Sequence, residues 1–218
     1  MNDALKILKK AVLFAGIPDE VLLREILPHG QLQQYVREQF LIEPQQQVTR
    51  FGVILSGKVH VMHLFPEGTY SLMSVLTAEK ILGADLICTR SQISPYHSIA
   101  AAPTDVMYFP ASMLTHPGLL QETLRLDVLN RLLTLISQEN MKKTYRLAIL
   151  SQKGLRERIM AYLTMQAARL QSNTFSIPFS REELASFLCV NRSALSHELS
   201  LMQQENLISF RKNVFTIH

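Results

Sequence analysis

The sequence has no tryptophan and only two cysteines, Cys88 and Cys189, among its 218 residues. Two cysteines cannot build a framework of several disulfides, and they cannot supply the four thiolates of a cysteine-only zinc or iron–sulfur site. We therefore expect a protein of the reducing cytoplasm that carries no iron–sulfur cluster.

Long hydrophobic runs are also missing. The run from Leu147 to Leu150 is representative, whereas a membrane helix needs about 20 apolar residues. The first ten residues place Asp3 early and contain no apolar segment followed by a small-residue cleavage site. We expect neither a membrane span nor a secretory signal.

Hydrophobic residues make up 47% of the chain and charged residues 18%, which is typical of a globular protein and argues against disorder. The charge is uneven: residues 141–218 hold 11 Lys or Arg against 5 Asp or Glu, whereas residues 1–140 hold 11 against 13. A basic C-terminal part behind a slightly acidic N-terminal part indicates a phosphate-bearing partner for the former.

Residues 32–110 have the pattern of short β-strands. In residues 51–64, Val59, Val61 and His63 alternate with His60 and Met62, and the turn residues 66–68 precede a partner strand at 69–75. Strands this closely spaced, with no helices between them, predict an antiparallel roll rather than a parallel sheet. A short helix is expected before them, from Pro18 to Leu27.

A long helix is predicted from Leu119 to about Lys143, which contains no proline or glycine. One of its apolar faces has the spacing of paired helices, and a second apolar face lies elsewhere on the helix. We assign the second face to the roll and the first, which we call the seam, to a second subunit; burial of one helix in a single large core is the alternative. The seam consists of Leu126, Leu129, Leu133, Ile136 and Asn140; the second face consists of Leu124, Val128, Leu132 and Leu135.

The C-terminal part predicts three helices and a hairpin. Helical periodicity over 155–170 predicts the first helix, which Asn173 terminates. Ser180 and Glu183 form a capping box that opens a second helix running to Leu188. After a turn at 189–190, in which we interpret Cys189 as a packing residue, Asn191 caps a third helix over 192–205. Strands at 207–210 and 214–217 follow. This order is typical of a helix-turn-helix followed by a short hairpin.

The third helix sorts its side chains by face. Leu195, Leu199 and Met202 are spaced to point into a core, and the polar residues fall on the opposite side. Arg192 has the donors to read guanine, and a serine can contact a base or a phosphate. A helical bundle with a merely solvated polar face is the alternative. The predicted DNA-binding residues are Ser180, Arg181, Arg192, Ser193, Ser196, His197 and Lys212.

Five segments resemble the Crp/Fnr family of bacterial transcription factors: 54–61, 82–85, 109–114, 206–209 and above all 180–199. The resemblance implies an α+β protein with an antiparallel, jelly-roll-like β-roll sensor domain at 1–115. A dimerisation helix at 116–148 and a winged helix-turn-helix DNA-binding domain at 149–218 would follow. It further implies a homodimer on a palindromic operator, response to a small effector, and RNA polymerase as a partner.

Departures from the family pattern restrict which effector the protein can bind. Members that bind cyclic AMP have Glu where this chain has Ala84, and an Arg-Ser or Arg-Thr pair where it has Ser94-Pro95. Alanine cannot accept a bond from a ribose hydroxyl, and neither Ser94 nor Pro95 can neutralise a phosphate. We therefore expect an effector other than cyclic AMP, and no cofactor. Its predicted pocket is lined by Ala84, Tyr96, His97 and Ser98.

Several alternatives stay open. His60 and His63 fall on opposite strand faces, which disfavours haem or another metal there. Cys88, beside Arg90, would be a redox thiol if that charge lowered its pKa; an inert side chain is favoured. The protein could also be a regulator whose pocket is filled by its own side chains. A cupin-like metalloenzyme with a helical module is the rival from another class, but we expect no enzyme activity.

Overall fold

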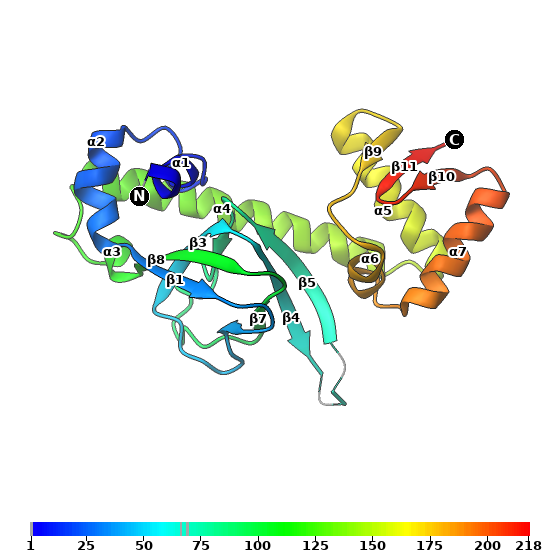
Figure 1. Ribbon diagram of the computed structural model, residues 1–218, viewed down its shortest axis with the longest axis horizontal. Helices are drawn as coiled ribbons and strands as arrows, with labels where there is room; N and C mark the ends of the chain where they lie inside the picture. Colours follow the sequence, from blue (N-terminus) through cyan, green and yellow to red (C-terminus); the bar gives the residue numbers. More distant parts are fainter. Residues whose placement is uncertain (1, 66, 69) are drawn as a thin grey trace. The chain divides into compact units, whose positions relative to one another are not determined.

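The computed structural model describes residues 2–65, 67–68 and 70–218 (Figure 1). The chain divides into two compact units, residues 1–69 with 73–139 and residues 70–72 with 140–218. No helix of the described residues is long and apolar enough to cross a membrane.

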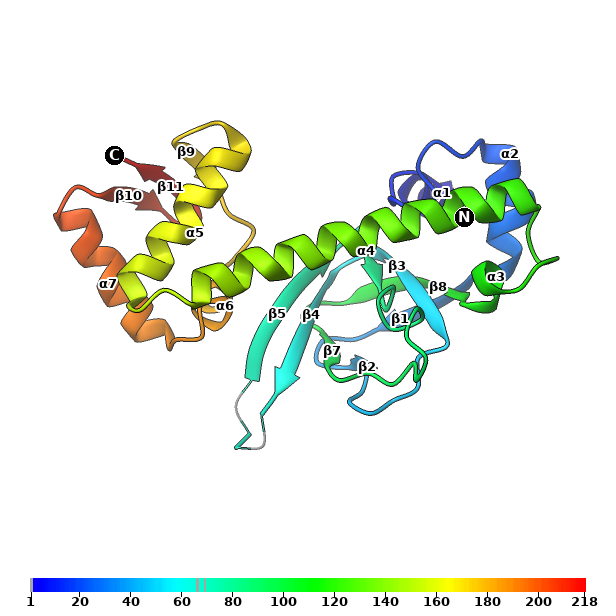
Figure 2. The same ribbon diagram turned by 180° about the vertical axis from the view of Figure 1, so that it is seen from behind.

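The first unit is built on two antiparallel sheets, as predicted from the strand pattern (Figures 1 and 2). One sheet has the order β1-β8-β3-β6 and the other β2-β7-β4-β5. The strands are β1 (Gln31–Tyr35), β2 (Phe40–Ile42), β3 (Arg50–Ser56), β4 (Lys58–Leu64), β5 (Tyr70–Thr77), β6 (Ile81–Leu82), β7 (His97–Ala100) and β8 (Thr104–Pro110). The predicted strand at 69–75 corresponds to β5. Pro66 of the predicted turn and Thr69, the first residue of that predicted strand, lie outside the described residues.

Helical segments flank the roll in sequence. α1 (Asn2–Leu8) comes first, and the helix predicted at 18–27 is present as α2 (Asp19–Val21), a π-turn η1 (Leu22–Ile26) and a 3₁₀ turn η2 (Leu27–His29). Pro28 falls inside η2, so the helical path ends at His29 rather than before the proline. α3 (Ser112–Thr115) follows β8.

The long helix α4 (Glu122–Leu150) starts and ends later than predicted. Its second apolar face packs as expected: Val128 and Leu132 are 0% and 4% exposed and belong to the core of the first unit. The seam is more open, with Leu126 48% and Leu133 65% exposed. Leu129 and Ile136 are partly buried against the core, and Asn140 is exposed.

The burial of His97 predicts that the stability of the first unit depends on pH. It begins β7, is 2% exposed, and its ring packs edge-on against Phe40. Burial, and secondarily the nearby His63, lower the pKa of His97 below its ordinary value of 6.5. Below that pH the unfolded chain binds a proton that the folded chain resists, so stability is complete above it and decreases as pH falls.

We expect the free energy of unfolding to decrease below about pH 6.5 with a contribution of up to about 1.4 kcal/mol per pH unit from this group. Urea denaturation at several pH values, in wild type and His97→Asn, measures it. The variant should show a shallower acid decrease; parallel profiles would assign the acid sensitivity to other groups.

The second unit contains the C-terminal helices and a small sheet. Its elements are α5 (Leu155–Leu170), β9 (Thr174–Ser176), α6 (Arg181–Phe187), α7 (Arg192–Gln204), β10 (Ile208–Arg211) and β11 (Val214–Ile217). α5 has the bounds of the predicted helical periodicity, 155–170, and it ends there because Gln171, before the predicted terminator Asn173, adopts a left-handed conformation with φ of 50°. β9 was not predicted; it pairs with β11 in a sheet of order β10-β11-β9.

Candidate nucleic-acid interface

The helix-turn-helix is fixed by caps that the sequence predicts. Ser180 Oγ accepts the N–H of Glu183 at 3.2 Å, and Glu183 Oε2 accepts the N–H of Ser180 at 2.7 Å, which completes the capping box of α6. Asn191 Oδ1 accepts the N–H of Ala194 at 2.7 Å and so caps α7. These bonds satisfy N–H groups that a helix start leaves without partners, and they set where each helix begins.

The turn between α6 and α7 is a Schellman motif. The N–H of Val190 donates to Ala185 O at 3.0 Å, and that of Cys189 donates to Ser186 O at 3.1 Å. Cys189 occupies its left-handed position with φ of 57°, where glycine is the usual residue. Its side chain is exposed, so the interpretation of Cys189 as a packing residue is wrong.

We expect Cys189→Gly to raise the free energy of unfolding by about 0.5–1 kcal/mol, because glycine adopts a left-handed conformation without the steric penalty of a Cβ atom. Urea denaturation measures the change. Cys189→Ala is the matched control, since it removes the thiol but keeps the Cβ atom. Equal stability of the two variants would contradict the backbone explanation.

α7 separates an apolar face from a polar one. Leu195, Leu199 and Met202 are each 0% exposed and belong to the core of the second unit. Arg192, Ser193 and His197 are exposed, whereas Ser196 is half-buried. Ser193 Oγ donates to Asn191 Oδ1 at 2.9 Å, which holds this hydroxyl near the helix start. The first two turns of α7 therefore present a polar face that contains Arg192 and His197.

Arg181 bridges α6 and the hairpin β10–β11, which we call the wing. Its guanidinium carbon lies 4.8 Å from the ring centre of Phe210 and 5.5 Å from that of Phe215, and its Nη2 donates to Lys212 O at 3.3 Å. Burial lowers the pKa of Arg181, with a smaller contribution from the nearby Arg192. Arg181, Arg192 and the exposed Lys212 thus gather positive charge beside the start of α7.

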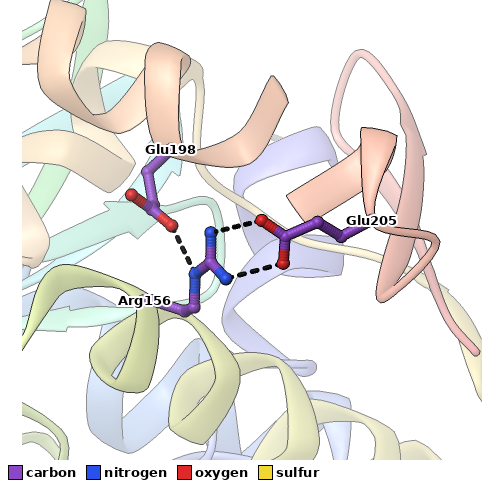
Figure 3. Close-up of polar contacts among 3 residues, drawn as sticks. All are labelled: Arg156, Glu198 and Glu205. Carbon is purple, nitrogen blue, oxygen red and sulfur yellow. Dashed lines mark hydrogen bonds and ion pairs between the residues drawn. The ribbon is translucent and has the colours of Figure 1, made fainter. Parts of the chain in front are cut away.

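A charged cluster that sequence reasoning missed ties α7 to α5 (Figure 3). Arg156 Nε donates to Glu198 Oε1 at 2.6 Å, and its Nη1 and Nη2 donate to the two carboxylate oxygens of Glu205 at 2.6 and 3.0 Å. These two carboxylates, above all that of Glu205, raise the pKa of Arg156. The forked contact fixes the rotation of α7 about its own axis. The seven-residue spacing of Glu198 and Glu205, which puts both on one face, was the available signal.

We expect Arg156→Gln to weaken binding of DNA by α7 several-fold, because two carboxylates lose their cation and α7 loses a fixed orientation. The slope of log affinity against log salt should stay unchanged, because Arg156 is ion-paired with Glu198 and Glu205 and is not expected to neutralise a phosphate. Arg156→Lys keeps the charge without the fork, and we expect an intermediate affinity. A reduced slope would instead identify Arg156 as a phosphate contact.

The residues predicted to line an effector pocket are all buried. Ala84 and Tyr96 are 7% exposed, His97 2% and Ser98 0%. The Tyr96 hydroxyl donates to Asp85 Oδ1 at 2.7 Å, so that the tyrosine side chain is anchored to the segment after Ala84. Ser98 Oγ is buried and has no hydrogen-bond partner among the described residues.

The cysteine and metal alternatives gain no support. Burial, and secondarily Asp85, raise the pKa of Cys88, which is the opposite of what a reactive thiolate requires. Among the described residues, no group of three or more His, Cys, Asp or Glu is arranged to hold a metal ion.

Two family models match the chain. The model of the cyclic nucleotide-binding domain matches residues 32–116, and that of the Crp-like helix-turn-helix domain matches residues 157–218. No curated protein matches the sequence significantly.

Many solved structures share the fold. Three of them are FixK2 from Bradyrhizobium japonicum (15% identity, TM-score 0.65, 87% of this chain and 92% of that one), the c-di-GMP-responsive global regulator CLP of Xanthomonas campestris (15%, 0.69, 90% and 97%) and a CooA variant from Carboxydothermus hydrogenoformans (19%, 0.62, 91% and 89%). At these identities the likeness shows the fold alone.

The domain pair and the fold define a DNA-binding transcription regulator with an effector-binding domain. The chain belongs to the Crp/Fnr family, as the resemblance implied.

Proposed function

We propose that the protein is a homodimeric transcription factor that binds a palindromic operator through α7 and is regulated by a small effector other than cyclic AMP. The observation that carries the proposal is the two-sided character of α7: three core residues at 0% exposure on one face, and Arg192, Ser193 and His197 exposed on the other. A helix of this kind, second in a helix-turn-helix, is the element that enters the major groove.

The roles of the polar residues follow from their donors. Arg192 reads guanine O6 and N7 through its fork, and Ser193, Ser196 and His197 supply single contacts to bases or phosphates. Ser180, Arg181 and Lys212 hold the backbone on either side. The Ser180 hydroxyl accepts a bond in the capping box, and its own proton can be donated to a phosphate oxygen.

The homodimer is supported by the seam on α4. Leu126 and Leu133 expose large apolar side chains on the helix face away from Val128 and Leu132, which are buried in the first unit. A second copy of the helix would cover them by side-by-side packing, and Asn140 would help to fix the register. Two copies related by a two-fold axis would present two α7 helices to two half-sites.

Regulation would proceed through the first unit, because α4 contributes residues to both units. An effector can shift operator affinity only if it binds one arrangement of the dimer better than the other. Neither Ala84 nor the Ser94-Pro95 pair offers a cyclic nucleotide its usual contacts. We infer RNA polymerase as a further partner from the family alone, and we propose no enzyme activity.

A ligand-independent regulator is the second candidate, and Tyr96 favours it. Its buried ring and its bond to Asp85 place a side chain of the protein itself beside Ala84, where relatives that bind cyclic AMP have the ribose contact. In that case operator binding would need no added effector.

Selection from a random duplex DNA pool, with purified protein and no added ligand, tests the proposal. Enrichment of a two-fold palindrome whose affinity falls steeply with salt would support a dimeric operator binder that is competent alone. If nothing is enriched, the selection is repeated with a cytosolic metabolite extract. Enrichment only then would support effector control, and failure in both would contradict DNA binding.

A further inference from the structure

A cavity of about 160 Å³ lies in the first unit, and none of the four residues of the predicted effector pocket is among the residues that line it. Its apolar wall is formed by Leu41, Ile42 and Val48, which are 7%, 3% and 5% exposed. Its polar wall contains Gln46, Gln47, Thr49, Arg50 and Tyr108. None of these lining residues is an aspartate or a glutamate.

Arg50 is the positively charged side chain among the residues that line this cavity. Its guanidinium carbon lies 4.1 Å from the ring centre of Tyr108, and its Nη2 donates to Gln33 Oε1 at 2.9 Å. These contacts use one face and one donor of the guanidinium and leave Nε and Nη1 available. No carboxylate of the described residues lies within 4.0 Å of it, and the side chain is half-buried. A half-buried guanidinium held in place without a counter-ion is a ready partner for an anion.

The surroundings hold Arg50 in a fixed position. Gln33 Oε1 also accepts the Tyr35 hydroxyl at 2.7 Å, and the hydroxyls of Tyr35 and Tyr108 are 3.0 Å apart. Burial raises the pKa of Tyr108 above its ordinary value, so this phenol stays neutral and does not compete as an anion. Arg50 and Tyr108 are therefore held in place before any ligand binds, which lowers the entropic cost of binding.

We propose that this cavity binds a small organic monocarboxylate with a compact apolar body about the size of a benzene ring. The carboxylate would pair with Arg50, and the apolar body would contact Leu41, Ile42 and Val48. An engineered cavity of about 150 Å³ in another protein holds benzene, which sets the scale of the ligand. A free amino acid fits less well, because its ammonium group would meet no acidic partner among the lining residues and would be repelled by Arg50.

Gln46 adds a second donor to this site. Its Oε1 accepts the N–H of Glu43 at 2.8 Å, so its amide group is oriented with the NH₂ end free to donate. The proposal rests on the proposed regulation by a small effector only for its biological role. Binding itself is measured without DNA, so that failure of the site and failure of operator recognition are distinguishable.

Isothermal titration of the full chain tests the site, with benzoate as the probe and benzamide as its neutral counterpart. We expect saturable binding of benzoate and at least about tenfold weaker binding of benzamide, because only the carboxylate forms a charge-assisted pair. No saturable binding of benzoate up to about 10 mM, or equal binding of both compounds, would overturn the proposal. This comparison needs no variant and so does not depend on the folding of one.

Arg50→Gln then assigns the contact. We expect it to weaken benzoate binding by about tenfold or more and to leave benzamide binding unchanged. Arg37→Gln is the matched control, since Arg37 carries the same charge on the first unit with its side chain 72% exposed. Benzoate binding that survives Arg50→Gln, in a variant with an unchanged melting temperature, would place the ligand elsewhere and overturn the assignment.

Discussion

Arg192→Gln is expected to lower affinity for the selected operator by about 10- to 100-fold. Arg192 is exposed in the first turn of α7, and a guanidinium that reads one guanine with two donors contributes about 1–3 kcal/mol to discrimination between bases. Loss of the fork should also relax sequence preference at one position of each half-site. Fluorescence anisotropy at fixed salt, with operators mutated one base pair at a time, measures both effects.

Arg169→Gln is the matched control for this substitution. Arg169 lies in the last turn of α5 and is exposed, so its replacement removes the same charge from the same unit but not from α7. We expect it to change affinity little at every base position. An equal loss in both variants, with the sequence preference kept, would mean that Arg192 contributes only general charge.

Leu133→Glu is expected to convert the protein from a dimer to a monomer. Leu133 is 65% exposed, so a glutamate there costs the folded chain little, but in a paired helix it would bury two like charges against each other. Sedimentation equilibrium should give the 24.8 kDa mass of one chain for the variant and twice that mass for wild type. Affinity for a full palindrome should fall by about 100-fold or more, since the two half-sites no longer cooperate through one molecule.

Thr134→Glu provides the control for charge. Thr134 is the next residue on α4, is exposed, and lies outside the seam. We expect a dimer with nearly wild-type operator affinity. A monomeric Thr134→Glu variant, or a dimeric Leu133→Glu variant, would contradict the seam as the subunit interface.

Local signals explain why much of the DNA-binding unit was predictable from sequence. The capping box at Ser180 and Glu183 and the cap at Asn191 act within three residues, and the spacing of Leu195, Leu199 and Met202 reports one helix face. The strands of the roll were predictable for the same reason, since alternation and turn residues are read within a few positions.

Features that depend on distant parts of the chain were not predictable. β9 forms because residues 174–176 pair with residues 214–216. The sequence of three residues does not indicate which distant strand will pair with them. Arg156 meets Glu198 and Glu205 only after α5 and α7 pack together. Cys189 adopts a left-handed conformation because the Schellman motif requires one at this position, although a residue with a Cβ atom disfavours positive φ.

The cavity beside Arg50 was missed for a similar reason. Arg50 and Gln33 come from strands that are not neighbours in sequence, and Tyr108 comes from a third. The family resemblance instead predicted a pocket at Ala84 and Tyr96. In the structure both side chains are buried, and Tyr96 is hydrogen-bonded to Asp85.

The most direct test of a two-fold dimer on DNA is the effect of half-site spacing on affinity. Inserting about 5 base pairs between the half-sites of the selected operator turns one half-site to the opposite side of the duplex, whereas about 10 base pairs restores its face at a greater distance. A dimer joined through α4 predicts that the 5-base-pair insertion reduces affinity to that of a single half-site. Affinity that is indifferent to this insertion would mean that each chain binds alone, and would contradict the account.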